Sequence, residues 1–108
     1  MDNTLYKHLF NENIRLLSNL SGFSENDIKK SRKEDCQECR FLLIIIAIEY
    51  KVSFAQISRF SGFTIPQIER AFSQKEERLE KFDIRKSLEL IRENTTKNIN
   101  KYYSSINV

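Results

Sequence analysis

The stretch Ser53–Arg70, with the sequence SFAQISRFSGFTIPQIER, contains the starts of two helices and the turn between them. Each start fits a capping box, in which a hydroxyl caps the third helical N–H and a glutamine reaches back to the N–H of the cap. The two boxes are Ser53 with Gln56 and Thr64 with Gln67. Gly62 lies between them, and Pro66 falls in the first turn of the second helix, where its missing N–H costs little. Two capped helices joined by a short glycine-containing turn predict a helix-turn-helix over about 53–73.

A longer helix is predicted before this unit, over about 33–50. Its second half, FLLIIIAI at 41–48, is apolar on every face and should be the most buried element. A strand is the competing interpretation, because three consecutive isoleucines favour β structure. The flanking helical patterns and the lack of turn signals favour the helix.

The rest of the chain also indicates helices, since it contains only two glycines and one proline in 108 residues. We expect a first helix that begins with Asp2 or Asn3 as its N-cap and ends at Gly22. A short second helix is expected after Ser24.

One or two amphipathic helices are predicted after Phe72, with Asp83 as a cap where the helix restarts. The tail 94–108 is rich in Asn, Thr, Ser and Lys, which predicts fraying, although three of its side chains are able to dock on the core. These are Ile99, Tyr102 and Tyr103. We therefore predict an all-α, compact helical bundle with an embedded helix-turn-helix, formed by residues 1–108 as a single domain.

These residues give little indication of a catalytic site. The one histidine, His8, has no predicted nucleophile beside it, and two isolated glycines cannot form a phosphate-binding loop. Four carboxylates are most simply a solvated helix face: Glu76, Glu77, Glu80 and Asp83. We expect no catalysis, no cofactor, no metal and no nucleotide.

Cys36 and Cys39 have the spacing of a metal or redox pair, but no second Cys or His pair completes a zinc site. Reduced cysteines in or near the core are the simpler interpretation. Two cysteines, no visible signal peptide and no apolar run near the ~20 residues of a membrane span predict a cytoplasmic protein without a membrane partner.

The charge of the chain is polarised rather than large. The formal net charge is +3, yet four of the five residues at 29–33, KKSRK, are basic. We expect phosphate contacts from these four, which are Lys29, Lys30, Arg32 and Lys33. Arg32 is also long enough to enter a minor groove. The alternative is that this run is ordinary solvated surface.

The second helix of a helix-turn-helix lies in the major groove, with its N-terminal residues facing base edges. Those residues here are Thr64, Gln67, Arg70 and further along Gln74. Glutamine can bond adenine and arginine can bond guanine, so these residue types suit base recognition. Thr64 and Gln67 are also the capping pair, and holding the helix start is the alternative role for both.

The order of these motifs resembles that in a known family. Ser24–Ile28 leads into Ser31-Arg32-Lys33, Cys39-Arg40-Phe41 follows, Ser53–Ser58 forms a capped helix, and Phe60-Ser61-Gly62 forms a turn before Thr64–Ile68. Residues 14–71 thereby resemble the C-terminal DNA-binding domain of the bacterial replication initiator DnaA, a helical fold related to the Trp repressor. The resemblance implies DNA contacts from Arg32, Lys33, Arg40 and the start of the recognition helix.

This chain departs from the family at the recognition helix. Ile65, Pro66 and Gln67 occupy the His and Thr positions of the family's D-H-T-T-V signature, and Phe41 replaces the glutamine after the arginine. A different DNA sequence, or no sequence preference, is therefore expected rather than the initiator's own binding site. The initiator's ATPase domain has no counterpart here, so nucleotide-driven origin melting is not expected.

The sequence thus predicts a stand-alone protein that binds double-stranded DNA, in transcriptional regulation or in replication control of a chromosome or mobile element. A homodimer is one route to useful specificity for so small a helix-turn-helix, although no heptad seam is visible. The alternative function is a protein–protein interaction module on a helix-turn-helix scaffold that has lost DNA binding.

Overall fold

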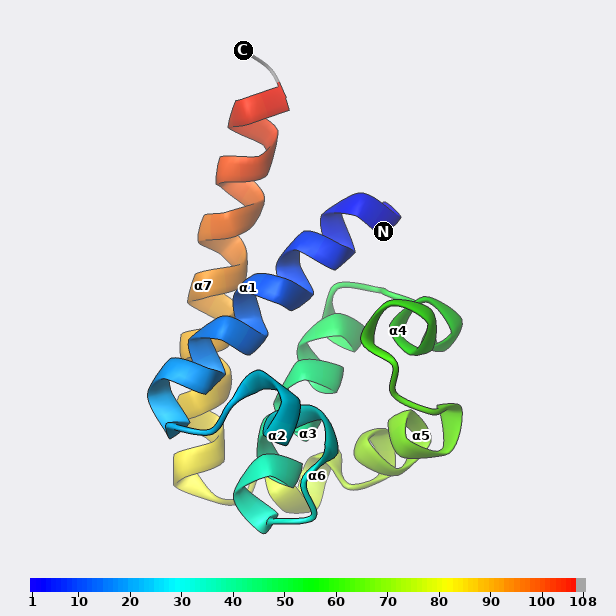
Figure 1. Cartoon of the computed structure of the whole chain (residues 1–108), viewed down its shortest axis with the longest axis vertical. Helices are drawn as coiled ribbons and strands as arrows, with labels where there is room; N and C mark the ends of the chain where they lie inside the picture. Colours follow the sequence, from blue (N-terminus) through cyan, green and yellow to red (C-terminus); the bar gives the residue numbers. More distant parts are fainter. Residues whose placement is uncertain (107–108) are drawn as a thin grey trace.

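The computed structural model describes residues 1–106, and these form helices and their connections without any strand. The helices are α1 Asn3–Ser21, α2 Glu25–Lys30, α3 Glu34–Glu49, α4 Phe54–Ser61, α5 Ile65–Ser73, α6 Lys75–Arg78 and α7 Phe82–Ile106. The all-α prediction is confirmed, and the described chain measures 42 × 27 × 25 Å along its principal axes. Figure 1 shows α1 and α7 side by side, α4 and α5 on the other side of the molecule, and α3 between these two groups.

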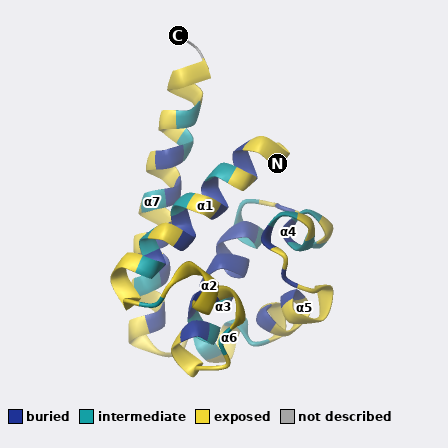
Figure 2. Cartoon of the chain, in the orientation of Figure 1, coloured by how far each residue is buried: buried dark blue, intermediate teal, exposed yellow. Residues whose placement is uncertain are grey.

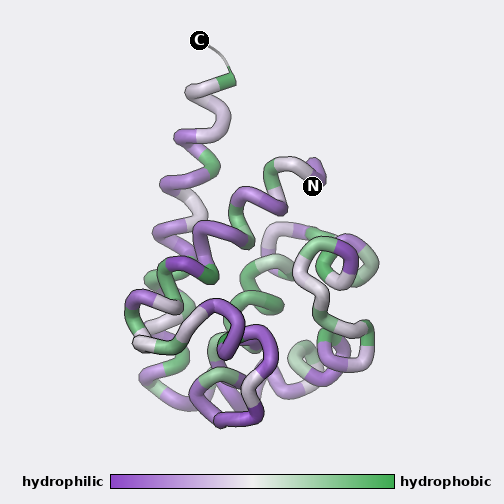
Figure 3. Tube along the Cα trace, viewed as in Figure 1, coloured by the Kyte–Doolittle hydropathy of each residue, from purple (hydrophilic) through white to green (hydrophobic). Residues whose placement is uncertain are grey.

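Helix α3 is the centre of the core, and it is predicted correctly as a helix rather than a strand. Every residue from 41 to 47 is buried. Contacts from α1, α2, α4, α5 and α7 surround it, and in Figures 2 and 3 its buried, apolar trace lies inside the more exposed and hydrophilic outer helices. A helix that is apolar on all faces is stable only when it is covered on all faces.

The helix ends agree with the predicted caps. The carboxylate of Asp2 accepts from the N–H groups of Thr4 and Leu5 at the start of α1, and the Ser24 hydroxyl accepts from the third helical residue of α2. Gly22 ends α1 with a φ of 79°, a left-handed conformation that costs glycine little.

Helices α4 and α5 are joined by the three residues 62–64, and both predicted capping boxes are present. Gly62 ends α4 with a φ of 82°. Phe63, the next residue, turns inward and is buried against Phe10 of α1, with the ring centroids 6.0 Å apart. The turn is therefore anchored to the core, and it directs the start of α5 away from α4.

Helix α7 differs from the prediction at both ends. It begins at Phe82, so Asp83 lies in its first turn rather than at its cap, and it continues as a helix through the segment expected to fray. Thr95 and Asn98 of that segment are buried. Residues 107–108 of the predicted tail lie outside the described residues.

Polar contacts explain why this part of α7 is ordered despite its composition. Asn13 of α1 is buried, and its Nδ2 donates to Oγ1 of Thr95 at 3.0 Å. The Asn94 amide donates to Oδ1 of Asn13 at 3.1 Å, and the Arg92 Nε donates to Oε2 of Glu49 on α3 at 3.0 Å. Among the residues named as able to dock, Ile99 and Tyr102 are half-buried and Tyr103 is exposed.

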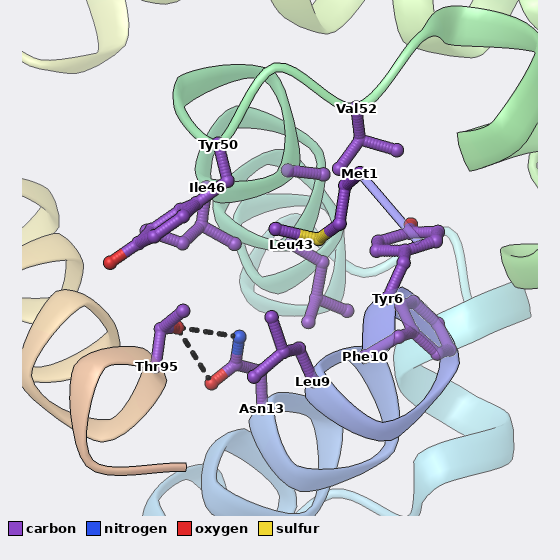
Figure 4. Close-up of a pocket in the computed structure, with 11 residues that line it drawn as sticks. Met1, Tyr6, Leu9, Phe10, Asn13, Leu43, Ile46, Tyr50, Val52 and Thr95 are labelled. Atoms are coloured by element: carbon purple, nitrogen blue, oxygen red, sulfur yellow. Dashed lines mark hydrogen bonds between the residues drawn. The ribbon is translucent and has the colours of Figure 1, made fainter. Parts of the chain in front are cut away.

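A small cavity lies beside this polar contact, as Figure 4 shows. Its volume is about 10 Å³, close to the ~10–15 Å³ that one water molecule requires and far below a ligand pocket of ~300 Å³. The Tyr6 hydroxyl is buried near it without a hydrogen-bond partner in the described chain, and burial raises the pKa of this phenol well above its usual range. The cavity belongs to the core.

None of the helices within residues 1–106 combines the length and the apolar composition that a membrane-spanning segment needs.

The buried polar contact gives a test of how α7 is held. Thr95→Val keeps the side-chain shape but leaves the buried Asn13 amide without its acceptor, so we expect the free energy of unfolding to fall by about 1–3 kcal/mol in urea denaturation. Thr4→Val, on an exposed face of α1, is the control and should change stability by less than about 0.5 kcal/mol. Equal effects of the two substitutions would contradict the assigned role.

Candidate nucleic-acid interface

A groove of about 540 Å³ lies between the α2–α3 connection and α5, and we call it the basic groove. One wall carries Lys29, Lys30 and Arg32, and the other carries Gln67, Arg70, Gln74 and Arg78. Helix α3 contributes the polar Gln37 and Arg40. The lining also includes smaller and apolar residues, which are Phe41, Ile44, Gly62, Phe63 and Ala71. Six of these residues are basic and none is acidic.

The basic groove brings together most of the residues predicted to bind DNA. Six of the eight line it: Lys29, Lys30, Arg32, Arg40, Gln67 and Arg70. The other two do not. The Lys33 ammonium lies over the Phe23 ring, 5.4 Å from its centroid, and the Thr64 hydroxyl caps α5 by accepting from the Gln67 N–H at 3.2 Å.

Most of the positive charge in the groove is not neutralised by carboxylates. Arg78 pairs with Glu34 at 3.0 Å. The other five basic residues have no ion-pair partner within residues 1–106. A concave surface lined by charges of one sign concentrates the electrostatic potential, so this groove attracts anions.

Arg40 has a positioning role at the base of the groove. Its Nη1 donates to the carbonyl of Ile28 and its Nη2 to the carbonyl of Ser31, both at 2.7 Å. Nearby, the Gln37 amide donates to the Arg32 carbonyl, also at 2.7 Å. These bonds fix the course of the basic segment and cover three carbonyl oxygens that would otherwise repel an anion.

Gln67 has the capping role that was the alternative to base contact, and it also lines the groove. Its Oε1 accepts from the Thr64 N–H at 2.8 Å. The side chain is exposed, and its NH₂ group has no partner within the described chain. Arg70, one turn further on the same face, is exposed and makes no ion pair there.

Sequence reasoning did not identify Gln37 and Arg78 as parts of this surface. The Arg78 Nε donates to the Gln74 Oε1 at 3.0 Å, and its guanidinium lies 5.6 Å from the centroid of the Phe41 ring. The i,i+4 spacing of Gln74 and Arg78 was a usable signal, but α6 is only four residues long and follows α5 directly. The position of Arg78 in the groove therefore depends on the tertiary fold.

The cysteines lie apart from the basic groove, on the buried side of α3. Cys36 and Cys39 are both free and buried. Burial raises the pKa of the Cys39 thiol from 9.0 to about 11, with smaller contributions from Cys36, Glu38 and Asp35. No cluster of three or more metal-ligating side chains occurs within residues 1–106.

Comparison of the chain with protein-family models, with curated proteins and with solved structures found no match.

The bidentate contact of Arg40 can be tested without changing charge. Arg40→Lys replaces a planar fork by a single ammonium, which cannot reach both carbonyls. We expect the free energy of unfolding to fall by about 1–2 kcal/mol, with faster hydrogen exchange at the Ser31 and Lys33 amides. Arg59→Lys, on the exposed surface of α4, is the control and should leave exchange in this segment unchanged. Unaltered exchange in Arg40→Lys would refute the positioning role.

The Cys39 thiol gives a test of its burial. A raised pKa keeps the thiol protonated at neutral pH, and only the thiolate is nucleophilic. In a Cys36→Ser variant we expect iodoacetamide to label native Cys39 slowly at neutral pH and faster as the pH approaches about 11. The stability that the protonated thiol contributes is full below pH 9.0 and is lost as the pH rises from 9.0 to about 11. Rapid labelling of the native protein at neutral pH would contradict this, and urea-unfolded protein is the positive control.

Proposed function

We propose that this chain binds double-stranded DNA through the basic groove, with α4 and α5 acting as a helix-turn-helix. The observation that carries the proposal is the convergence of basic side chains from the end of α2, the α2–α3 connection, α3, α5 and α6 on one groove, whose described lining includes no carboxylate. A helix face that is merely solvated needs no such convergence from separate parts of the chain.

The groove suits a sugar–phosphate backbone. Lys29, Lys30 and Arg32 on one side and Arg70 on the other can contact phosphates, which are the main source of affinity in protein–DNA binding. The apolar residues beneath them are suited to sugar contacts, since they offer no competing charge. The covered carbonyls of the α2–α3 connection support the same chemistry.

Helix α5 supplies a surface for the major groove. Its inner face holds the buried Ile68 and Ala71. Its groove-facing side holds Gln67 and Arg70, and its first turn, including Pro66, is exposed. An exposed N-terminal turn with polar side chains is what a recognition helix presents to base edges.

A regulator of transcription or replication is the corresponding biological class, as the resemblance to the DnaA C-terminal domain suggests. The altered recognition-helix signature supports a target other than the initiator's own site.

A protein-binding module is the second candidate, because α7 exposes apolar side chains along its length. Leu90, Tyr103 and Ile106 are 48%, 51% and 58% exposed. The two candidates differ in their dependence on salt: association through these side chains would change little with ionic strength, whereas phosphate contacts weaken steeply. Sedimentation at low and high salt would also detect a homodimer formed in this way.

Fluorescence anisotropy of a labelled random-sequence duplex, titrated from low to moderate salt, tests DNA binding. We expect log-linear loss of affinity with log salt, and a slope about one unit smaller for Arg32→Ala because one phosphate contact is lost. Lys97→Ala removes the same charge from an exposed site on α7 and should leave the slope unchanged. Absence of binding at low salt would refute the proposed function, and equal slopes for both variants would refute the role of the groove.

A further inference from the structure

The orientation of two amides in the basic groove is set by the chemistry of their partners. The Thr64 N–H and the Arg78 Nε–H can only donate, so each must be met by an amide oxygen. The oxygens are Oε1 of Gln67 at 2.8 Å and Oε1 of Gln74 at 3.0 Å. Both glutamines therefore keep their NH₂ groups, which have no partner within residues 1–106, for a ligand in the groove.

The remaining lining is also rich in donors. The carbonyls of Ile28, Ser31 and Arg32 already accept bonds from α3, and the lysine and arginine side chains have no acceptor. Gln37 uses its NH₂ for the Arg32 carbonyl, so its Oε1 is the one amide oxygen of the groove's glutamines that is left for a ligand among the described residues. The groove thus presents donors from both walls.

The acidic residue of α5 does not change this pattern. Glu69 is exposed but is not among the residues that line the groove. Glu69 follows Ile65 by four residues and precedes Phe72 by three, so the three side chains lie on one face of the helix. Ile65 and Phe72 are 37% and 50% exposed. These three residues form an outer face of α5, separate from the face that carries Gln67 and Arg70.

Base edges differ in whether they match a donor surface. In the major groove guanine offers two acceptors, N7 and O6, whereas adenine offers N7 beside an N6 donor, thymine offers one acceptor, O4, beside its methyl group, and cytosine offers a donor. The usual bidentate contact of glutamine with adenine needs the amide oxygen, and in Gln67 that oxygen belongs to the capping box. The bidentate contact with adenine would break the cap of α5, whereas bonds donated to guanine would not.

We propose that the basic groove selects guanine-containing DNA, with the Gln67 NH₂ and the Arg70 guanidinium donating to guanine N7 and O6. The inference rests on the proposed DNA binding and adds the base that is recognised. Gln67 and Arg70 lie three residues apart on one face of α5, so they are placed to contact neighbouring base pairs.

The probe is a duplex that the native protein selects from a random library. Its guanines are then replaced, one at a time, with 7-deazaguanine. This base pairs normally but lacks N7. We expect the selected duplexes to be enriched in guanine, and at least one replacement to weaken binding by about tenfold, the loss typical of one specific base contact. In Arg70→Ala or Gln67→Ala the same replacement should have a smaller effect.

Gln67→Glu is the sharper variant, because glutamate also completes a capping box but cannot donate. We expect it to fold normally and to lose the preference for guanine over 7-deazaguanine at the position where Gln67→Ala reduces it, while the position contacted by Arg70 keeps that preference. Asn11→Asp adds the same charge at an exposed position of α1, outside the groove, and should keep that preference. For each variant, the affinity for the guanine duplex is divided by the affinity for the 7-deazaguanine duplex. This ratio is compared because an added carboxylate weakens phosphate contacts with every duplex alike.

The outcomes separate this inference from the proposed function. Salt-dependent binding without guanine enrichment, or without any effect of 7-deazaguanine, would overturn the selection of guanine and leave DNA binding intact. In Gln67→Glu, a guanine preference retained at the position where Gln67→Ala reduces it would overturn the role of the Gln67 NH₂. Absence of binding to any duplex at low salt would overturn both.

Discussion

The burial of the second half of α3 is the constraint on which the rest of the structure depends. Seven consecutive residues, 41–47, are buried, and burying a large apolar side chain contributes about 1.5–3 kcal/mol. A helix with no polar face must be surrounded, so α1, α2, α4, α5 and α7 are all required as its cover. The walls of the basic groove are two of these covering parts, and their separation follows from the helix they share.

The first and second halves of α3 have different roles. The second half is apolar and holds the core together. The first half presents Gln37 and Arg40 to the α2–α3 connection, where they bond its carbonyls and hold its cations in place. Because both halves belong to one rigid helix, the basic segment is fixed relative to α5, and the groove is a property of the folded core rather than of a mobile loop.

Several residues serve the fold and the proposed site together. Gln67 caps α5 with its oxygen and keeps its NH₂ for a ligand, and Gln74 does the same through its bond to Arg78. Each structural bond consumes an acceptor, so the hydrogen bonds that stabilise the helices also make the surface rich in donors. A structural role and a binding role for these glutamines are therefore compatible. The structural bond uses the amide oxygen, so the group that remains for binding is the NH₂ donor.

Local sequence signals were sufficient for the helices because the interactions that end them are local. Asp2, Ser53 and Thr64 cap within three residues, and Gly22 and Gly62 supply the left-handed turns that end α1 and α4. The apolar run of α3 was equally predictable from the sequence. The end of α7 could not be predicted in this way, because its buried stripe continues from Ile91 through the polar Thr95 and Asn98. The partner that makes the burial of Thr95 favourable is Asn13, 82 residues away.

The sequence by itself determined the all-helical class, the cap and turn positions and most of the cations of the proposed site. Tertiary structure decided which of those cations share a groove, that Arg40 bonds backbone carbonyls, that Arg78 joins the lining while Lys33 does not, and which glutamine atoms are left for a ligand. The physical reason is one of range. Caps and periodicity act within a helical turn or two, whereas the orientation of a donor depends on partners that only the packed core brings within hydrogen-bonding distance.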